Sequence, residues 1–145
     1  MFELVDEPLN VPYFYEKYFN FYKDKNFGAF LSFCGIVRAE DDIQALSFDI
    51  YDNLLKTWFD EWQESVKKDN IKLCFAHSRG DVKIHESSYF AAVLSPQRKK
   101  GLQILNDFVE DFKARAPIWK YDIKNSQRIY AKYRSTVLKE AGLLQ

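Results

Sequence analysis

The segment 111–122, DFKARAPIWKYD, holds the residues best suited to chemistry. Lys113 and Lys120 lie on either side of Pro117, and a chain reversal at this proline would bring both amines to one pocket beside Trp119. Paired amines in a partly apolar pocket lower each other's pKa, which suits proton transfer or anion binding. A purely structural explanation is also open, in which Lys113 complements the C-terminus of a helix and Lys120 is an exposed strand lysine.

Two arginines are further candidates for binding an anion. Arg38 follows the apolar run 28–37, and Arg98 opens a predicted helix. An arginine at the end of an element can hold a phosphate with its fork of N–H donors. Each of the two could equally be an ordinary surface charge.

Motifs of the common enzyme classes are missing from the sequence. It has no glycine-rich nucleotide loop, no CxxC, no HExxH and no GxSxG. Because its only histidines are His77 and His85, a dedicated zinc site is not expected. Cys34 and Cys74 lie in apolar, strand-like runs, so we interpret them as structural thiols, with a Cys–His nucleophile pair as the open alternative.

The elements that must position these residues are a mixture of strands and helices. Apolar periodicity and turn residues predict helices over 12–23, 52–68 and 97–114, and strands over 2–5, 28–37, 46–50, 71–77, 83–95, 118–122 and 128–133, before a frayed or helical tail. Asp52 is the expected N-cap of the second helix. This order predicts one α/β (mixed α+β) domain spanning 1–145.

Apolar residues at helical spacing predict the faces that pack on the core. In the first helix they include Tyr15 and Phe19, in the second Leu54, and in the third Leu102. We expect all four side chains to be buried.

The composition is that of a globular protein with an uneven distribution of charge. Of 145 residues, 47% are hydrophobic and 29% charged, and no apolar run approaches the length of a membrane span. The acidic N-terminal segment does not resemble a signal peptide, so we expect a cytoplasmic protein. Lys and Arg balance Asp and Glu overall, but the first 97 residues carry a net −6 and the rest +6. The basic half should therefore meet an anion, or the two halves should meet each other.

Read in order along the chain, five motifs resemble those of the MoaE family, the large catalytic subunits of molybdopterin synthase. The first and last are the specific ones, and the three between them match more loosely. The motifs are GAFLSFCGIVR at 28–38, DIY at 49–51, HSRG at 77–80, SPQR at 95–98 and KARAPIWK at 113–120.

The resemblance implies a fold, a reaction and a partner. The fold would be the MoaE-like α/β hammerhead, with a mixed or antiparallel sheet, two main packed helices and an N-terminal helix. The enzyme would be a sulfurtransferase that converts cyclic pyranopterin monophosphate (precursor Z) into molybdopterin. The sulfur would arrive as a thiocarboxylate on the C-terminal Gly-Gly tail of a small ubiquitin-like subunit, MoaD. Large subunits of this family form homodimers, and heterotetramers with two small subunits, and the step uses no metal or other cofactor.

The resemblance also implies roles for individual residues. Lys120 would transfer a proton or stabilise charge during sulfur transfer, and Lys113 would position the tail or the pterin. Arg38 and Arg98 would clamp the substrate phosphate, from the same or different protomers. Phe33 and Trp119 would form apolar walls, although both could equally pack in the core.

The chain departs from the family pattern at two positions of the site. Gln97 replaces a histidine before Arg98, so it can donate a hydrogen bond to the phosphate but brings no charge. Asp122 replaces a glutamate after the WK pair. Beyond it, Arg128 or Arg134 could join the anion site.

Two other functions are compatible with the sequence. Residues 113–139 carry eight basic side chains against one acidic, interleaved with aromatic residues, as a nucleic-acid-binding surface would. That function predicts salt-sensitive binding of RNA or single-stranded DNA. The other is a non-catalytic scaffold that keeps the partner-binding groove, for which Gln97 is the only hint.

Overall fold

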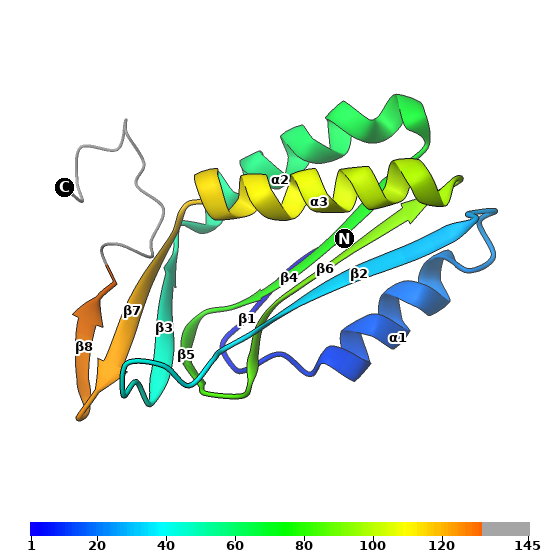
Figure 1. Cartoon of the computed structure of the whole chain (residues 1–145). Helices are drawn as coiled ribbons and strands as arrows, with labels where there is room; N and C mark the ends of the chain where they lie inside the picture. The colour runs from blue at the N-terminus through cyan, green and yellow to red at the C-terminus, as the bar shows by residue number, and fades with distance from the viewer. Residues whose placement is uncertain (132–145) are drawn as a thin grey trace.

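The structure, a computed structural model, describes residues 1–131. It contains two four-stranded sheets and three α-helices (Figure 1). The helices are α1 (Val11–Tyr22), α2 (Asp52–Val66) and α3 (Arg98–Arg115). The strands are β1 (Phe2–Val5), β2 (Ala29–Ile36), β3 (Ala45–Ile50), β4 (Lys72–Ser78), β5 (Gly80–Lys83), β6 (Ser87–Ser95), β7 (Ile118–Lys124) and β8 (Gln127–Tyr130), and a short 3-10 turn, Lys67–Asp69, follows α2.

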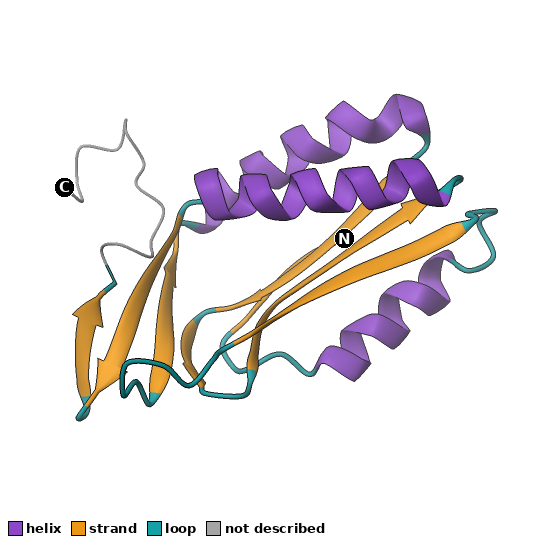
Figure 2. Ribbon diagram, viewed as in Figure 1, coloured by secondary structure: helices purple, strands orange, loops and turns teal. Residues whose placement is uncertain are grey.

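The first sheet, in the order β1-β4-β6-β2, lies between two layers of helix (Figure 2). Side chains alternate between its faces, so two separate cores form. One core contains Phe75, Tyr89 and Phe108 and lies beneath α2 and α3. The other contains Tyr18 and Phe90 and lies against α1. The sheet is antiparallel except for the parallel pair of β1 and β4.

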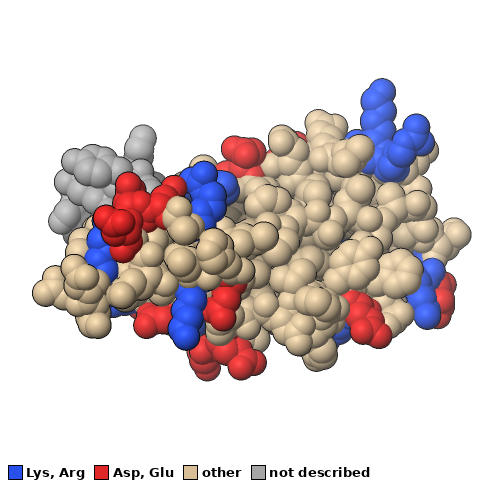
Figure 3. Space-filling model, turned by 60° about the horizontal axis from the view of Figure 1, so that its bottom comes forward, with Lys and Arg blue, Asp and Glu red and all other residues tan. Residues whose placement is uncertain are grey.

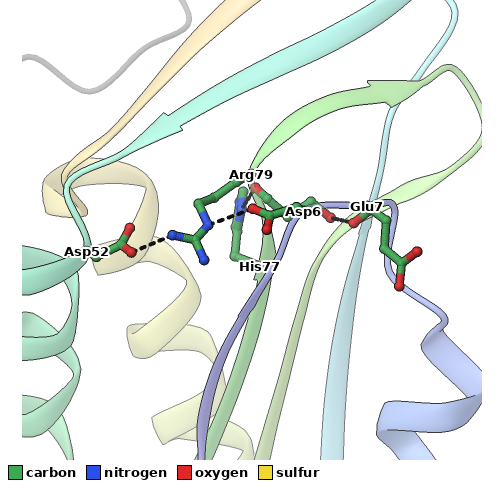
Figure 4. Close-up of polar contacts among 6 residues, drawn as sticks. Asp6, Glu7, Asp52, His77 and Arg79 are labelled. Carbon is green, nitrogen blue, oxygen red and sulfur yellow. Dashed lines mark hydrogen bonds and ion pairs between the residues drawn. The ribbon is translucent and has the colours of Figure 1, made fainter.

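The second sheet, in the order β5-β3-β7-β8, is antiparallel throughout and adjoins one end of the first. Strand β4 of the first sheet leads directly into β5 of the second, and Arg79 at this junction forms ion pairs with Asp52 of α2 and, at 3.0 Å, with Asp6 (Figure 4). The hydroxyl of Ser78 donates to the carbonyl oxygen of Glu7 at 2.9 Å. The junction is therefore fixed to both β1 and α2.

The mixed α+β fold with three helices is confirmed, and two local predictions are wrong. Tyr51, not Asp52, is the N-cap residue of α2, and Asp52 is its first helical residue and binds Arg79. The stretch expected as one strand over 83–95 is divided into β5 and β6 by a turn at 84–86, where His85 has a φ of 72°. The expected tail and Arg134 lie outside the described residues.

Four apolar side chains expected in the core are exposed instead. Tyr15 and Phe19 of α1 are 45% and 43% exposed, and Leu54 and Leu102 are about half exposed. The periodicity that predicted the helices was correct, but their apolar stripes are wider than the surfaces that cover them.

Both cysteines are free thiols, with Cys74 buried and Cys34 partly exposed. Within residues 1–131, no helix is both long enough and apolar enough to cross a membrane.

Candidate functional site

A pocket of about 500 Å³ lies where the two sheets meet beneath the C-terminal end of α3. The first sheet contributes Phe33, Gly35, His77 and Tyr89 to it. The remaining lining residues come from α3 and the turn after it (Phe112, Lys113, Ala116), from the second sheet (Leu46, Phe48, Ile118, Lys120), from other positions of the first sheet (Cys34, Ile36, Ser88), and from the loop after β2 (Val37, Arg38, Glu40).

The strand register explains why these side chains converge. Tyr89 of β6 lies directly opposite Gly35 of β2 on one side and His77 of β4 on the other. In the second sheet Phe48 of β3 lies opposite Lys120 of β7. Directly opposed residues of an antiparallel pair share a face, so each set projects toward the pocket.

The two lysines reach the pocket through the chain reversal expected at Pro117. Helix α3 ends at Arg115, and the carbonyl of Pro117 accepts a hydrogen bond from the backbone N–H of Tyr51 at 3.2 Å, which holds the start of β7 beside the end of β3. Lys113, in the last turn of α3, and Lys120, in β7, both line the pocket. The predicted convergence of the lysines is confirmed.

Arg38 and Phe33 line the same pocket from β2 and the loop after it. The Arg38 side chain is 79% exposed and forms an ion pair with Glu40 at 2.9 Å, so it lies at the rim. Phe33 lies deeper, with its ring centroid 5.5 Å from that of Tyr89. One protomer thus brings together four of the seven predicted site residues.

The other three do not line this pocket. Arg98 and Gln97 lie at the opposite end of α3, because fifteen residues of helix separate Arg98 from Lys113, about 22 Å. Trp119 is buried, but it lies opposite Asp49 on the other face of β7 from Lys120. Trp119 is therefore not a wall of this pocket.

Arg128 also faces away from the pocket, contrary to expectation. Its guanidinium binds the carboxylate of Asp49 through two hydrogen bonds, of 2.7 and 3.2 Å, and lies 3.6 Å from the ring centroid of Tyr121. These contacts belong to the Trp119 face of the second sheet.

Two residues of the pocket were not singled out for chemistry by the sequence. His77 is buried, and its Nδ1 donates to the carbonyl oxygen of Ser78 at 2.8 Å (Figure 4). The pKa of His77 is lowered to about 4, mainly by burial and to a smaller extent by the charge of Lys120, against the raising effect of the Ser78 bond. Tyr89 is also buried, which raises the pKa of its hydroxyl. Both residues are thus neutral near pH 7.

The pocket therefore combines two amines and a rim guanidinium with an apolar, aromatic interior. Cations at the mouth of such a pocket can bind an anionic group and stabilise charge that develops beside it. Among residues 1–131, no three His, Cys, Asp or Glu side chains cluster as metal ligands would.

Comparisons with known proteins agree with this architecture. Residues 4–115 match the family described as MoaE protein. The chain is 55% identical over 120 residues to a molybdopterin synthase catalytic subunit from Helicobacter pylori strain ATCC 700392 / 26695, with 83% of each chain covered. A 26% identical catalytic subunit from Dictyostelium discoideum covers 81% of this chain and 77% of its own.

Solved structures give the same result. A protein-protein complex of subunit 1 and 2 of molybdopterin-converting factor from Helicobacter pylori 26695 contains a chain with a TM-score of 0.92 and 47% identity, with 99% of both chains covered. Molybdopterin synthase from Staphylococcus aureus matches with a TM-score of 0.72 and 27% identity, over 89% of this chain and 95% of its own. Ordered motifs, fold and relatives agree, and the chain belongs to the MoaE family.

Proposed function

We propose that this protein is the catalytic subunit of a molybdopterin synthase, which transfers sulfur from a thiocarboxylated small subunit to precursor Z to form the dithiolene of molybdopterin. The observation that carries the proposal is the convergence of Lys113, Lys120 and Arg38 on one pocket with aromatic walls. Family membership supports the same function. A cytoplasmic location stays a prediction.

The reaction requires that a negatively charged sulfur donor and an anionic substrate meet in one site. The thiocarboxylate sulfur forms a bond to a carbon of the substrate while a C–O bond to that carbon breaks and its oxygen leaves with the bonding electron pair, to be protonated or to stay on the phosphate. Water then hydrolyses the resulting thioester, breaking the bond between that sulfur and the tail carbonyl carbon. The tail is left as a carboxylate, and the sulfur stays on the substrate. Two such transfers complete the dithiolene.

We assign to Lys120 the stabilisation of the negative charge that develops during sulfur transfer. Its strand position opposite Phe48 places Lys120 on the lining of the pocket, where a cation partly shielded from solvent stabilises an oxyanion far better than it does in water. Lys120 is also suited to supply or accept the proton that moves when water hydrolyses the bond between the sulfur and the tail carbonyl carbon. Lys113, in the last turn of α3, positions the tail or the pterin.

The partner that delivers sulfur is a small MoaD-like subunit, whose extended Gly-Gly tail would enter the pocket. The Helicobacter pylori structure that resembles this chain is a complex of subunit 1 and 2 of molybdopterin-converting factor. No metal ion or nucleotide takes part in the steps proposed for this chain.

A second copy of the chain supplies Gln97 and Arg98 to the site. Strand β2 is an edge of the first sheet, with Ser95 beside its start and the pocket beside its end. If β2 pairs antiparallel with β2 of a second copy about an axis at Ser32, Ala29 of one copy lies opposite Gly35 of the other. Arg98 of each copy then lies beside the pocket of its partner.

The surface around β2 supports this arrangement. Tyr15 and Phe19 of α1 pack against Phe30 of β2 with ring centroids 5.0 and 5.8 Å away, and both remain more than 40% exposed. Leu102 on the other side of β2 and Ile36 at its end are more than half exposed. Figure 3 shows a broad uncharged surface over this part of the molecule. An apolar surface along an unpaired strand is typical of an interface.

The experiment that tests the shared site uses two inactive variants. Lys120→Ala and Arg98→Ala chains are co-expressed with different tags, and the mixed dimer is purified through both tags. If Arg98 acts across the dimer, one of the two sites contains both wild-type residues, so the mixed dimer keeps about half of the wild-type activity. If Arg98 acts within its own protomer, both sites are defective and activity stays at the level of the single variants. Failure to recover any mixed dimer would contradict the homodimer itself.

The nucleic-acid function has less support. Arg128 and Tyr121, two members of the basic and aromatic segment, contact each other and Asp49. Basic and acidic side chains are also interspersed on the face in Figure 3.

The scaffold function is tested by Gln97→His. A large gain in turnover would show that glutamine had cost activity, and equal rates would show that the histidine is dispensable.

A further inference from the structure

Glu40 is the only acidic side chain among the described residues that line the pocket. It shares the pocket with Lys113, Lys120 and Arg38, and its carboxylate accepts a hydrogen bond from Nη2 of Arg38 at 2.9 Å. A carboxylate in a site for anions is unexpected, because it repels the ligands that the cations attract. Glu40 therefore weakens the attraction of the pocket for anions.

The loop after β2 holds Glu40 in place by a tight turn. Asp41 and Asp42 both have left-handed backbone angles, with φ of 52° and 58°. The N–H of Ile43 donates to the carbonyl oxygen of Glu40 at 3.1 Å. These are the features of a type I′ turn that begins at Glu40. Because Val37 and Ile43 are buried on either side, the turn is anchored and places Glu40 by the backbone as well as by its ion pair.

The ion pair with Glu40 is the contact that positions the Arg38 guanidinium. The Arg38 side chain is too exposed for packing to hold it, and Glu40 is its one ion-pair partner within residues 1–131. The Glu40 side chain is more sheltered, at 33% exposed. Exposed ion pairs contribute little free energy, so a more highly charged ligand can open this one.

An anion that binds Arg38 must contend with the Glu40 carboxylate. The guanidinium has further N–H donors, but a phosphate bound to them would lie close to that carboxylate. Two anions at such a separation repel each other strongly where water is partly excluded. The phosphate and Glu40 therefore compete for Arg38, whether or not the carboxylate moves away.

We propose that Glu40 is an internal competitor for Arg38, which pairs with the guanidinium before the phosphate of a ligand binds and pairs with it again when that ligand leaves. This inference rests on the proposed function, because it concerns how that site holds and releases its anionic ligands. Glu40 lowers the affinity of the pocket mouth for anions in general, so inorganic phosphate occupies it less and the phosphorylated product leaves more readily. It acts through Arg38 and is a positioning residue.

The neighbouring Asp42 allows competition to be distinguished from simple charge repulsion. It carries the same charge as Glu40, but it does not line the pocket and makes no ion pair within the described part of the chain. Asparagine is favoured at a left-handed position, so Asp42→Asn removes the charge without disturbing the turn. A gain in anion affinity caused by net charge alone would appear in Asp42→Asn and Glu40→Gln alike.

The first test measures the affinity for phenyl phosphate by NMR titration, since this probe carries a dianionic phosphate on an aromatic ring. Glu40→Gln should bind it about 3-fold more tightly than wild type, which is the effect expected of a largely exposed ion pair. In the Arg38→Ala background the same substitution should have almost no effect, because no guanidinium remains to compete for. Asp42→Asn should bind the probe as wild type does.

Four results of this titration would overturn the proposal. They are unchanged or weaker binding by Glu40→Gln, an equal gain by Asp42→Asn, the same gain with and without Arg38, and an absence of binding by wild type and Glu40→Gln alike. The last result would show that Arg38 does not hold a phosphate.

The second test separates this proposal from the proposed function. In single-turnover reactions with thiocarboxylated small subunit, Glu40→Gln should lower the half-saturating concentration of precursor Z about 3-fold, and the maximal rate should change by a smaller factor. Inactive wild-type protein would reject the proposed function. An active wild type with an unchanged half-saturating concentration for Glu40→Gln would reject the competition alone. A maximal rate at least about 10-fold lower in Glu40→Gln would place Glu40 in the chemistry and contradict its role as a competitor.

Discussion

Acidification should destabilise this protein through His77. Burial lowers the pKa of His77 to about 4 in the folded state, whereas an unfolded histidine has a pKa near 6.5. Between these values the unfolded state binds more protons, so stability falls as the pH decreases from about 6.5 toward 4. Integrated from pH 7 to pH 5, the difference amounts to about 2 kcal/mol from this one residue.

The assay is urea unfolding at pH 7 and pH 5, with the wild type compared with His77→Asn. Asparagine can keep the hydrogen bond to Ser78 but does not titrate, so its loss of stability between the two pH values should be smaller by about 2 kcal/mol. His85→Asn is the control: His85 is exposed, and asparagine tolerates its φ of 72°. If His77→Asn and wild type lost equal stability, His77 would not be a buried neutral residue.

Three further substitutions test the packing around the site and the dimer. Gly101→Ala should destabilise the fold by about 1 kcal/mol in thermal unfolding, although alanine has the better helix propensity. The reason is that the new Cβ would lie 2.6 Å from Leu31 and 2.9 Å from Ser95. Equal or higher stability of the variant would contradict this contact. Asp111→Ala should lower the free energy of unfolding in urea by about 2 kcal/mol, because Asp111 accepts hydrogen bonds from the indoles of Trp58 at 2.9 Å and Trp62 at 2.7 Å. An unchanged free energy of unfolding would show that water replaces the carboxylate. Phe19→Glu should give folded monomers in sedimentation analysis, because Phe19 is exposed in the protomer and lies beside β2; intact dimers would exclude this surface from the interface.

The course of the chain could be predicted from the sequence because its signals are local. Pro117 ends α3 and brings Lys113 and Lys120 together, so their shared pocket followed from one residue and the helical pattern before it. The break between β5 and β6 was missed because the turn contains no glycine or proline and uses His85 in a left-handed conformation instead.

Burial on the helices was harder to predict. Tyr15 and Phe19 continue the apolar stripe of α1, and periodicity cannot distinguish a side chain that meets the core from one on an interface. Their exposure became informative only when the edge strand β2 was seen beside them.

The pocket interior depends on strand register, which a single sequence does not contain. Tyr89 and His77 lie within apolar strands and look like core residues until β4, β6 and β2 are aligned. Trp119 was misplaced for a related reason, because the alternation along β7 gives it the opposite face from Lys120. The separation of Arg98 from the pocket, in contrast, follows from helix length alone.

Single-turnover sulfur transfer by Lys120→Ala tests the central claim most directly. The variant, wild type and Lys124→Ala, a control on the same strand opposite Gln127, are each mixed with thiocarboxylated small subunit and precursor Z, and the dithiolene product is measured over time. We predict that Lys120→Ala loses at least about 100-fold in the rate of transfer, while Lys124→Ala and the affinity for the small subunit stay close to wild type. Transfer by Lys120→Ala at the wild-type rate would contradict the account.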